Sequence, residues 1–187
     1  MTTTRDWSRN KEMWIRVLEK QTGEGLEAWK AKMRRHTFRD EQQLRIWLSR
    51  RNVTGYAQQL LVMERFGYPD FVLATADELI GRQYADAPDL RAVYDAIVKA
   101  AANCGDLTIQ ARKTFVSLVS PRRTFARIQR AKARVNLGLR LDGQRPVGRL
   151  APSKIHDTMR LQIAVANVAQ VDAELRRWLE RAYAQNV

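Results

Sequence analysis

The chain has 187 residues, of which 45% are hydrophobic and 28% charged, and it carries a net charge of +13. This composition is typical of a folded globular protein, and the length allows one large domain or two small ones. The longest apolar runs, such as Leu60–Met63, are far shorter than the roughly 20 residues of a membrane span, and the N-terminus has no apolar run typical of a secretory signal. The single cysteine excludes an internal disulfide. We therefore expect a cytoplasmic protein that makes no membrane contact.

The first 68 residues are predicted to form a small all-helical domain. Apolar residues recur at helical spacing in four runs: Met13, Trp14, Val17 and Leu18; Leu26, Trp29 and Met33; Leu44, Trp47 and Leu48; and Ala57, Leu60 and Leu61. The sequence Gly67-Tyr68-Pro69 ends the last of these runs. Four of the five tryptophans lie in this part, namely Trp7, Trp14, Trp29 and Trp47. We expect them to fill the core of a domain too small to close with aliphatic side chains alone, and an aromatic ligand cage is the alternative.

Residues 69–87 are predicted to be a connector with a short helix at about 76–80, and residues 88–187 an α+β domain. Pro88 stands where helices often begin, and the apolar periodicity after it is helical until Cys104-Gly105. Beyond that point the period changes to two, which predicts strands at about 115–119, 125–129, 135–141 and 159–165. Ser120-Pro121 is a tight-turn signal, so the strands that flank it are expected to form an antiparallel hairpin. A last amphipathic helix follows Asn167 and Gln170, which have capping-box spacing.

These elements predict the α+β fold class, with a small all-helical N-terminal domain and then a helix–antiparallel sheet–helix two-layer C-terminal domain of four or five strands. If the apolar strand faces pack under the two helices, a polar set points to the opposite face. That set is Arg127, Gln129, Arg140, Arg160 and Gln162.

Several segments of the sequence resemble those of known protein families. In the C-terminal part they are Lys113-Thr114-Phe115-Val116-Ser117-Leu118, Phe125-Ala126, Leu137-Gly138-Leu139, Gly148-Arg149-Leu150, Val171-Asp172-Ala173-Glu174 and Trp178-Leu179. These segments resemble the bacterial domain-of-unknown-function family 5655. The N-terminal part is similar to domain-of-unknown-function family 4287, through Trp14, Thr22-Gly23, Leu26, Trp29, Trp47-Leu48 and Gly55-Tyr56-Ala57. The resemblance implies an architecture and no established activity.

The positive charge is concentrated in the predicted sheet. Residues 1–88 carry a net charge of +3 and residues 89–187 a net charge of +10, and the segment 112–149 holds 11 bases and one acid. A guanidinium-rich sheet face is able to bind phosphates, although a solvated outer face with basic turns is the alternative. The predicted nucleic-acid or anion-binding residues are Lys113, Arg122, Arg123, Arg127, Arg130, Lys132, Arg134, Arg140, Arg149 and Arg160. Phe115 and Phe125 are candidates for base stacking, but each is expected to lie in the core.

No catalytic motif stands out. Two histidines and one cysteine do not make a Cys/His zinc site, and no carboxylate spacing indicates a metal or a cofactor. Cys104 is expected to be a small buried residue that is chemically inert. We therefore expect a non-enzymatic protein whose partner is nucleic acid or another polyanion. The alternatives are a module that holds a small anionic ligand between the sheet and the loop 142–157, and an enzyme that uses His156.

Overall fold

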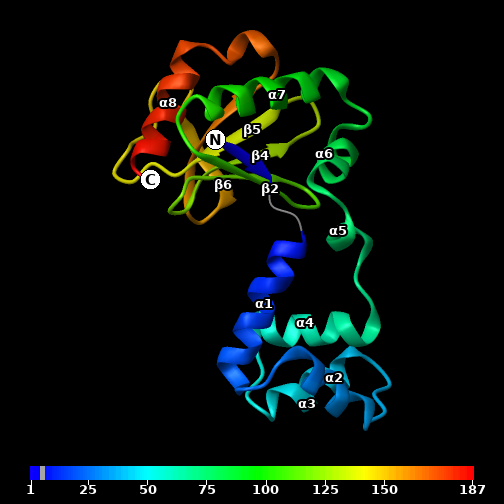
Figure 1. Ribbon diagram of the computed structural model, residues 1–187. Helices are drawn as coiled ribbons and strands as arrows, with labels where there is room; N and C mark the ends of the chain where they lie inside the picture. Colours follow the sequence, from blue (N-terminus) through cyan, green and yellow to red (C-terminus); the bar gives the residue numbers. More distant parts are fainter. Residues whose placement is uncertain (5–6) are drawn as a thin grey trace. The chain divides into compact units, whose positions relative to one another are not determined.

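The computed structural model describes residues 1–4 and 7–187 (Figure 1). The chain divides into a helical unit, residues 6–74, and a sheet unit, residues 1–5 with residues 75–187. The helical unit contains α1 (Trp7–Thr22), α2 (Leu26–Arg34), α3 (Glu41–Ser49), α4 (Gly55–Phe66) and α5 (Asp70–Leu73). The sheet unit contains β1 (Thr2–Thr4), α6 (Ala76–Tyr84), α7 (Pro88–Ala102), β2 (Leu107–Ala111), β3 (Val116–Val119), β4 (Thr124–Arg130), β5 (Val135–Leu139), β6 (Ala151–His156), β7 (Met159–Val165), a 3₁₀ turn η1 (Val168–Gln170) and α8 (Ala173–Ala184). The chain is an α+β protein, as the sequence predicts.

The helical unit encloses its own apolar core. Leu18, Leu44 and Leu60 are completely buried. Trp29 is buried with them, and its indole N–H donates a hydrogen bond to Thr22 Oγ1 at 3.0 Å. Trp14 and Trp47 are partly buried and pack against the same cluster, whereas the side chain of Trp7 lies outside the described residues. Trp14, Trp29 and Trp47 thus contribute to the core of the helical unit, as the sequence predicts.

The described strands form one sheet in the order β1-β2-β3-β4-β5-β7-β6. Every neighbouring pair is antiparallel except β1 and β2, which are parallel. The sequence pattern did not predict β1, β2 or β6. Because β1 lies beside β2 at the edge of the sheet, the helical unit is an insertion between β1 and the rest of the sheet unit.

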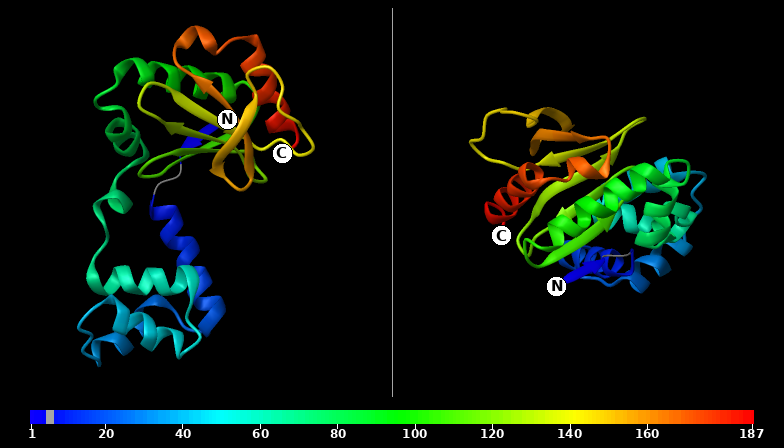
Figure 2. Two further views of the ribbon diagram at one scale, coloured as in Figure 1. Left: turned by 180° about the vertical axis from the view of Figure 1, so that it is seen from behind. Right: turned by 90° about the horizontal axis from the view of Figure 1, so that it is seen from above.

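Helices cover one face of the sheet. α7 and α8 contact each other, and both pack on β5, as Figures 1 and 2 show. The apolar strand residues of this layer are buried, and Leu118, Ile128, Leu137 and Ile163 are completely buried. The result is the predicted two-layer arrangement, in which every second residue of a central strand belongs to the core.

The last helix begins later than the sequence suggests. Asn167 precedes the 3₁₀ turn η1 and makes no side-chain capping bond, so the predicted capping box is wrong. The carboxylate of Asp172 caps α8 instead, because it accepts a hydrogen bond from the Leu175 backbone N–H at 3.0 Å. The Gln170 side chain accepts a hydrogen bond of 2.7 Å from the backbone N–H of Ala166, and not from that of the expected cap Asn167.

The domain ranges 1–68, 69–87 and 88–187 stay predictions, but α6 belongs to the sheet unit and packs on β2. Leu79, Ile80 and Tyr84 of this helix are buried. We expect a fragment of residues 75–187 to melt cooperatively, and a fragment of residues 86–187 to lose several kcal/mol, because each of these side chains contributes roughly 1.5–3 kcal/mol when buried. Thermal melts followed by circular dichroism compare the two fragments, which both lack β1. Equal melting temperatures would show that α6 adds nothing to the sheet unit.

Candidate anion-binding face

The face of the sheet away from α7 and α8 carries three of the predicted arginines. In β4, Ile128 belongs to the layer that is buried under the helices. Because neighbouring residues of a strand point to opposite faces, the side chain of Arg127 lies on the other face of the sheet. Arg140 directly follows β5 and Arg160 lies in β7, both in the same alternation. The strand pattern therefore brings these three side chains to one face, as predicted. We call Arg127, Arg140 and Arg160 the open-face arginines.

Small neighbours make room for Arg127. It pairs with Ser117 on β3 and with Gly138 on β5, neither of which has a large side chain. A Cβ at Gly138 would approach Ile155 Cδ1 to 3.2 Å, so the glycine permits β6 to fold closely over this row. The guanidinium of Arg127 stacks on the Phe115 ring, with its Cζ 4.0 Å from the ring centroid. Phe115 is only half-buried at this face, while Phe125 is completely buried against Tyr183 of α8.

Arg127 is held in an unfavourable electrostatic position. Burial lowers the pKa of Arg127 below its ordinary value, and the neighbouring charge of Arg112 lowers this pKa further. The Nε atoms of Arg127 and Arg140 are buried and have no hydrogen-bond partner among the described residues. Buried donors without partners are uncommon in folded proteins, and an external acceptor would satisfy them.

A polar pocket adjoins Arg140 and Arg160. Its volume is about 260 Å³, and it is lined by Arg140, Leu141, Asp142, Asp157, Thr158 and Arg160. A second hollow of about 450 Å³ shares Asp157 and Arg160 with it and adds Ser153, Lys154 and His156. This end of the face therefore combines cations with two carboxylates.

His156 serves the turn between β6 and β7. The backbone N–H of Thr158 donates to His156 Nδ1 at 3.2 Å, and the Thr158 hydroxyl lies 3.0 Å from the same nitrogen. An Nδ1 that accepts this bond carries no proton, so the neutral ring holds its proton on Nε2. Asp157 follows in the turn, and no bond between its carboxylate and the His156 ring is found in the described part of the chain. The local structure thus explains His156 without a catalytic role.

Three other predicted site residues are engaged in ion pairs within the sheet unit. Arg149 donates to Glu174 at 2.9 Å and to Asp172 at 2.6 Å. Arg130 forms a two-pronged pair with Asp86, with distances of 2.6 and 2.9 Å, and it also donates to the Gln83 carbonyl. Arg123 lies 3.8 Å from Asp142 and bonds the Gln185 carbonyl. These arginines hold helices and loops to the sheet, which is a structural role.

The remaining predicted residues lie in exposed turns. Lys113 lies between β2 and β3, Arg122 between β3 and β4, and Lys132 and Arg134 between β4 and β5. Arg134 donates to the Asn136 side chain at 3.0 Å. Sequence reasoning missed Arg112, which shares the surroundings of Arg127, and Lys154, because β6 was not recognised as a strand.

The described residues contain no group of three or more His, Cys, Asp or Glu side chains that could hold a metal ion. In the same residues no helix has the length and apolar character needed to cross a membrane.

Cys104 follows the last turn of α7 and is half-buried, with Sγ 3.8 Å from the Ala100 carbonyl. Burial raises the pKa of the Cys104 thiol, and the charge of Glu180 adds to the rise. Because the thiolate is the reactive form, we expect the native protein to react with a disulfide reagent at least several-fold more slowly at pH 7.5 than the same protein unfolded in guanidinium. Absorbance of the released thiol measures both rates, and equal rates would contradict the prediction.

Comparison with known protein families matches residues 80–186 to "Domain of unknown function (DUF5655)". The chain belongs to this family. The match covers α7, β2–β7 and α8 and hence nearly all of the sheet unit, including the open-face arginines. No curated protein and no solved structure matched the chain.

Proposed function

We propose that this DUF5655 protein binds the phosphate backbone of nucleic acid through the open-face arginines, without catalysis and with little reading of sequence. The observation that carries the proposal is that no hydrogen bond from the guanidinium of Arg127 or Arg140 is found among the described residues. The Nε atoms of Arg123 and Arg130 are also buried without a partner, but these two residues bond through their other guanidinium nitrogens. No ion pair to a carboxylate is found for the open-face arginines in the described part of the chain, whereas Arg130 and Arg149 both have such pairs. Phosphate oxygens are strong acceptors for guanidinium groups.

The surrounding charges extend the same surface. Arg112 adds its charge beside Arg127, and Lys154 adds another beside Arg160. Asp142 and Asp157 reduce the positive potential at the Arg140 end, so contact with phosphate is expected to be strongest around Arg127. The stacked Phe115 ring is half-buried under Arg127, which favours binding by charge over base stacking.

Salt dependence tests this proposal directly. Six predicted cations have no ion pair to a carboxylate among the described residues: Arg122, Arg127, Lys132, Arg134, Arg140 and Arg160. If all six contact phosphates, the logarithm of the binding constant for duplex DNA should fall against the logarithm of salt concentration with a slope of about −5 at most. Fluorescence anisotropy of labelled duplex and single strands between 50 and 200 mM salt measures the slope. No binding of either strand type at 50 mM would sink the proposal.

A second candidate is a small anionic ligand in the pocket between Arg140 and Arg160. The pocket of about 260 Å³ suits a phosphate-sized group, and Thr158 offers a hydroxyl beside the two guanidinium groups. Calorimetric titration with pyrophosphate distinguishes the two candidates. If the pocket is a site for a small anion alone, the protein should bind pyrophosphate and should not bind long nucleic acids.

We also propose that the helical unit is a domain of the type of domain-of-unknown-function family 4287, and that the protein is bacterial and cytoplasmic. The N-terminal residues that carry the resemblance support the family proposal. The single half-buried cysteine supports the cytoplasmic location.

A further inference from the structure

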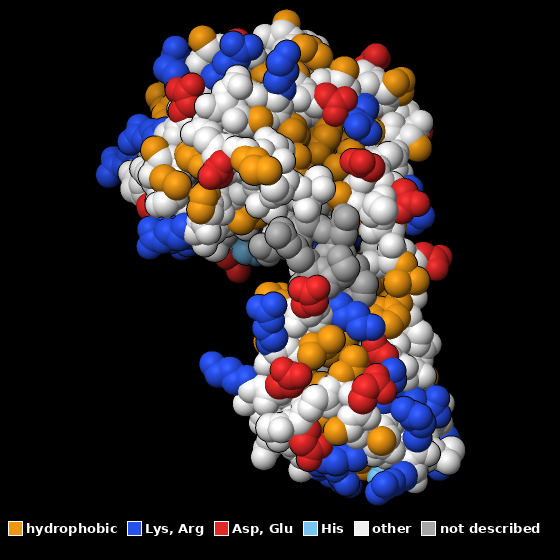
Figure 3. Space-filling view, in the orientation of Figure 1, with side chains coloured by type: hydrophobic (Ala, Val, Ile, Leu, Met, Phe, Trp, Pro, Cys, Tyr) orange, Lys and Arg blue, Asp and Glu red, His pale blue; other side chains and the backbone are white. Residues whose placement is uncertain are grey.

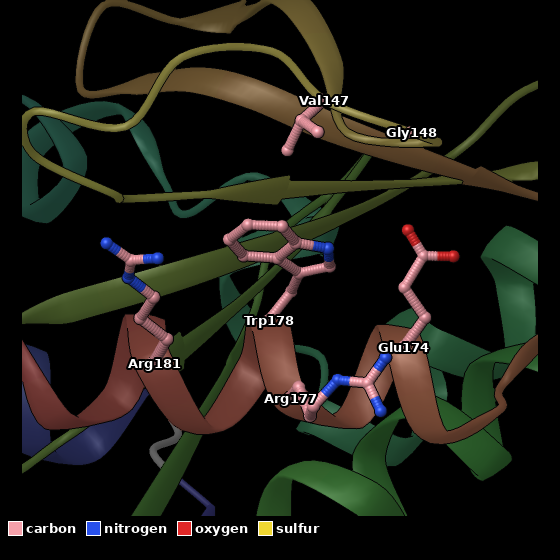
Figure 4. A pocket seen from close by; sticks show the side chains of 6 residues that line it. All are labelled: Val147, Gly148, Glu174, Arg177, Trp178 and Arg181. Carbon is pink, nitrogen blue, oxygen red and sulfur yellow. The ribbon is translucent and has the colours of Figure 1, made fainter.

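A separate hollow lies between α8 and the turn of residues 147–150. Its volume is about 490 Å³, within the usual range for small-molecule sites. The residues that line it are Val147, Gly148, Glu174, Arg177, Trp178 and Arg181 (Figure 4). None of them belongs to the open-face arginines, so this hollow is a different site.

The wall formed by the turn is fixed in place. Val147 and Leu150 exchange two backbone hydrogen bonds of 3.0 Å, which close the turn. The next anchor is Arg149, which bonds Glu174, Asp172 and the Gln170 carbonyl and so fastens the turn to the start of α8. A wall that is held before a ligand arrives lowers the ordering cost of binding.

The floor is apolar and aromatic. In Figure 4 the Trp178 indole stands between α8 and the turn, with Val147 facing it across the hollow. Trp178 is only half-buried, and the side chain of Val147 is 54% exposed although the turn that carries it is fixed. Trp178 is also the one tryptophan of the sheet unit, and the guanidinium of Arg181 lies over its ring, with Cζ 5.7 Å from the ring centroid. A flat ring that packs against this indole would therefore have a cation beside it.

The rim is positively charged. Arg177 and Arg181 lie one helical turn apart on α8, on either side of Trp178, and no ion pair of either is found among the described residues. Figure 3 shows Lys and Arg side chains along the margin of the sheet unit around α8, with hydrophobic side chains among them.

Glu174 is the carboxylate that lines the hollow, and Arg149 neutralises it. The hydrogen bond from Arg149 holds the pKa of Glu174 below its ordinary value, and the Trp178 indole contributes to the same effect. Its negative charge is thus already matched, and the two rim arginines leave the hollow net positive.

We propose that this hollow binds a small flat aromatic anion. The ring lies against Trp178 and Val147, and the anionic group is bound by the guanidinium groups of Arg177 and Arg181. An aromatic carboxylate and a nucleotide share this chemistry. A purely apolar ligand would leave both rim charges unmatched, and a plain inorganic anion would not use the aromatic floor.

The test uses the full-length protein and three matched probes. Calorimetry and ligand-observed NMR compare 1-naphthoate with the uncharged 1-naphthalenemethanol and the non-aromatic cyclohexanecarboxylate. A ligand of this size is expected to bind with a Kd on the order of 1 mM. We expect 1-naphthoate to bind at least about tenfold more tightly than either analogue, because each analogue lacks one of the two interactions. AMP in a parallel titration shows whether the site prefers a nucleotide to a carboxylate, and binding of either anion supports the proposal.

Variants locate the bound probe. Arg177→Gln with Arg181→Gln should weaken 1-naphthoate at least about tenfold. Val147→Glu, which keeps both arginines and places a carboxylate at the mouth, should weaken it as well. Arg176→Gln, on the same helix but outside the hollow, should leave the Kd unchanged. Thermal melts confirm that each variant is folded.

Three outcomes overturn the proposal: no binding of 1-naphthoate or AMP at ten times the expected Kd, equally tight binding of the uncharged probe, or an Arg176→Gln effect as large as that of the double variant.

Discussion

Replacing two half-buried arginines, Arg127→Gln with Arg140→Gln, should weaken binding of nucleic acid roughly 10- to 100-fold at low salt and should shallow the salt slope by about two. The physical reason is that neither guanidinium has a hydrogen-bond acceptor among the described residues, so a phosphate would provide one. Anisotropy titrations at several salt concentrations give both quantities. Glutamine is preferred to glutamate here, because a carboxylate buried beside Phe115 would confuse a loss of binding with a loss of fold.

The matched control is Lys99→Gln with Arg176→Gln. Both residues are exposed on the helices that cover the other face, and the change in net charge is the same. If bulk positive charge alone attracts the nucleic acid, the two double variants will weaken binding equally, and the proposal of a located face fails. We expect the control to change affinity less than about threefold, because screened charges far from the contact contribute little.

Stability separates the open-face arginines from the paired ones. Arg127 and Arg140 form no ion pair among the described residues, and Arg127 has only its stacking contact with Phe115 to lose, so their removal is expected to change the melting temperature by only a few degrees. Arg149→Gln should instead destabilise the protein without changing the affinity of the folded fraction, because it removes the bonds that fasten the 147–150 turn to α8. The Arg149→Gln variant thus tests the structural role that the ion pairs of Arg149 indicate.

Sequence periodicity predicted the fold correctly where a helix or a strand buries only one of its faces. The change from a helical period to a period of two after Gly105 predicted the order of helix, strands and helix. It also placed Arg127 opposite Ile128, and the register of β4 has this arrangement. Both conclusions depend on side-chain alternation alone, which is a local property of the chain.

Other parts of the fold depend on distant contacts and left no local signal. β1 is three residues long, and it is a strand because it pairs with β2 about a hundred residues further along the chain. β6 contains Pro152 and Ser153, and its exposed side chains lack the buried alternation of a central strand. An edge strand that buries little apolar surface cannot be recognised from hydrophobic pattern.

The candidate site shows the same limit. The arginine-rich segment was visible in the sequence, but the division into free and paired arginines was not, because Asp86, Asp172 and Glu174 lie far from their partners in the chain. Arg112 was missed as a site residue for a similar reason. It lies in the turn after β2, and its charge lowers the pKa of Arg127 only because the fold brings the two residues together. Charge runs indicate where cations gather, and the tertiary fold decides which of them remain available.

Gly105→Ala should be among the most destabilising single substitutions in the sheet unit, with a loss of about 3–5 kcal/mol of unfolding free energy. Gly105 follows α7 with φ at +148°, a conformation that residues with a Cβ rarely adopt. A Cβ there would lie 2.5 Å from Tyr183 Oη and 2.8 Å from Cζ. Tyr183 cannot easily withdraw, because its ring packs edge-on against the buried Phe125 and its hydroxyl donates to the Asp106 carbonyl at 3.1 Å.

Gly143→Ala is the matched control for this substitution. Its φ is also positive, at +72°, but a Cβ there meets nothing within 4 Å. The control therefore carries backbone strain without a clash and should cost about 1–2 kcal/mol. Urea denaturation of both variants gives the comparison, and a Gly105→Ala cost no larger than that of Gly143→Ala would contradict the packing argument.

A second substitution at the clash isolates the contribution of the Tyr183 hydroxyl. Tyr183→Phe removes Oη, which should cost about 0.5–1.5 kcal/mol through the lost hydrogen bond to Asp106. In the Gly105→Ala background the same change also removes the closest clashing atom. The double variant should therefore be more stable than the sum of the two single effects predicts, by about 0.5–3 kcal/mol. Strict additivity would mean that the new methyl group avoids Tyr183 by a shift of the 103–106 backbone, and the cost of Gly105→Ala would then lie in φ alone.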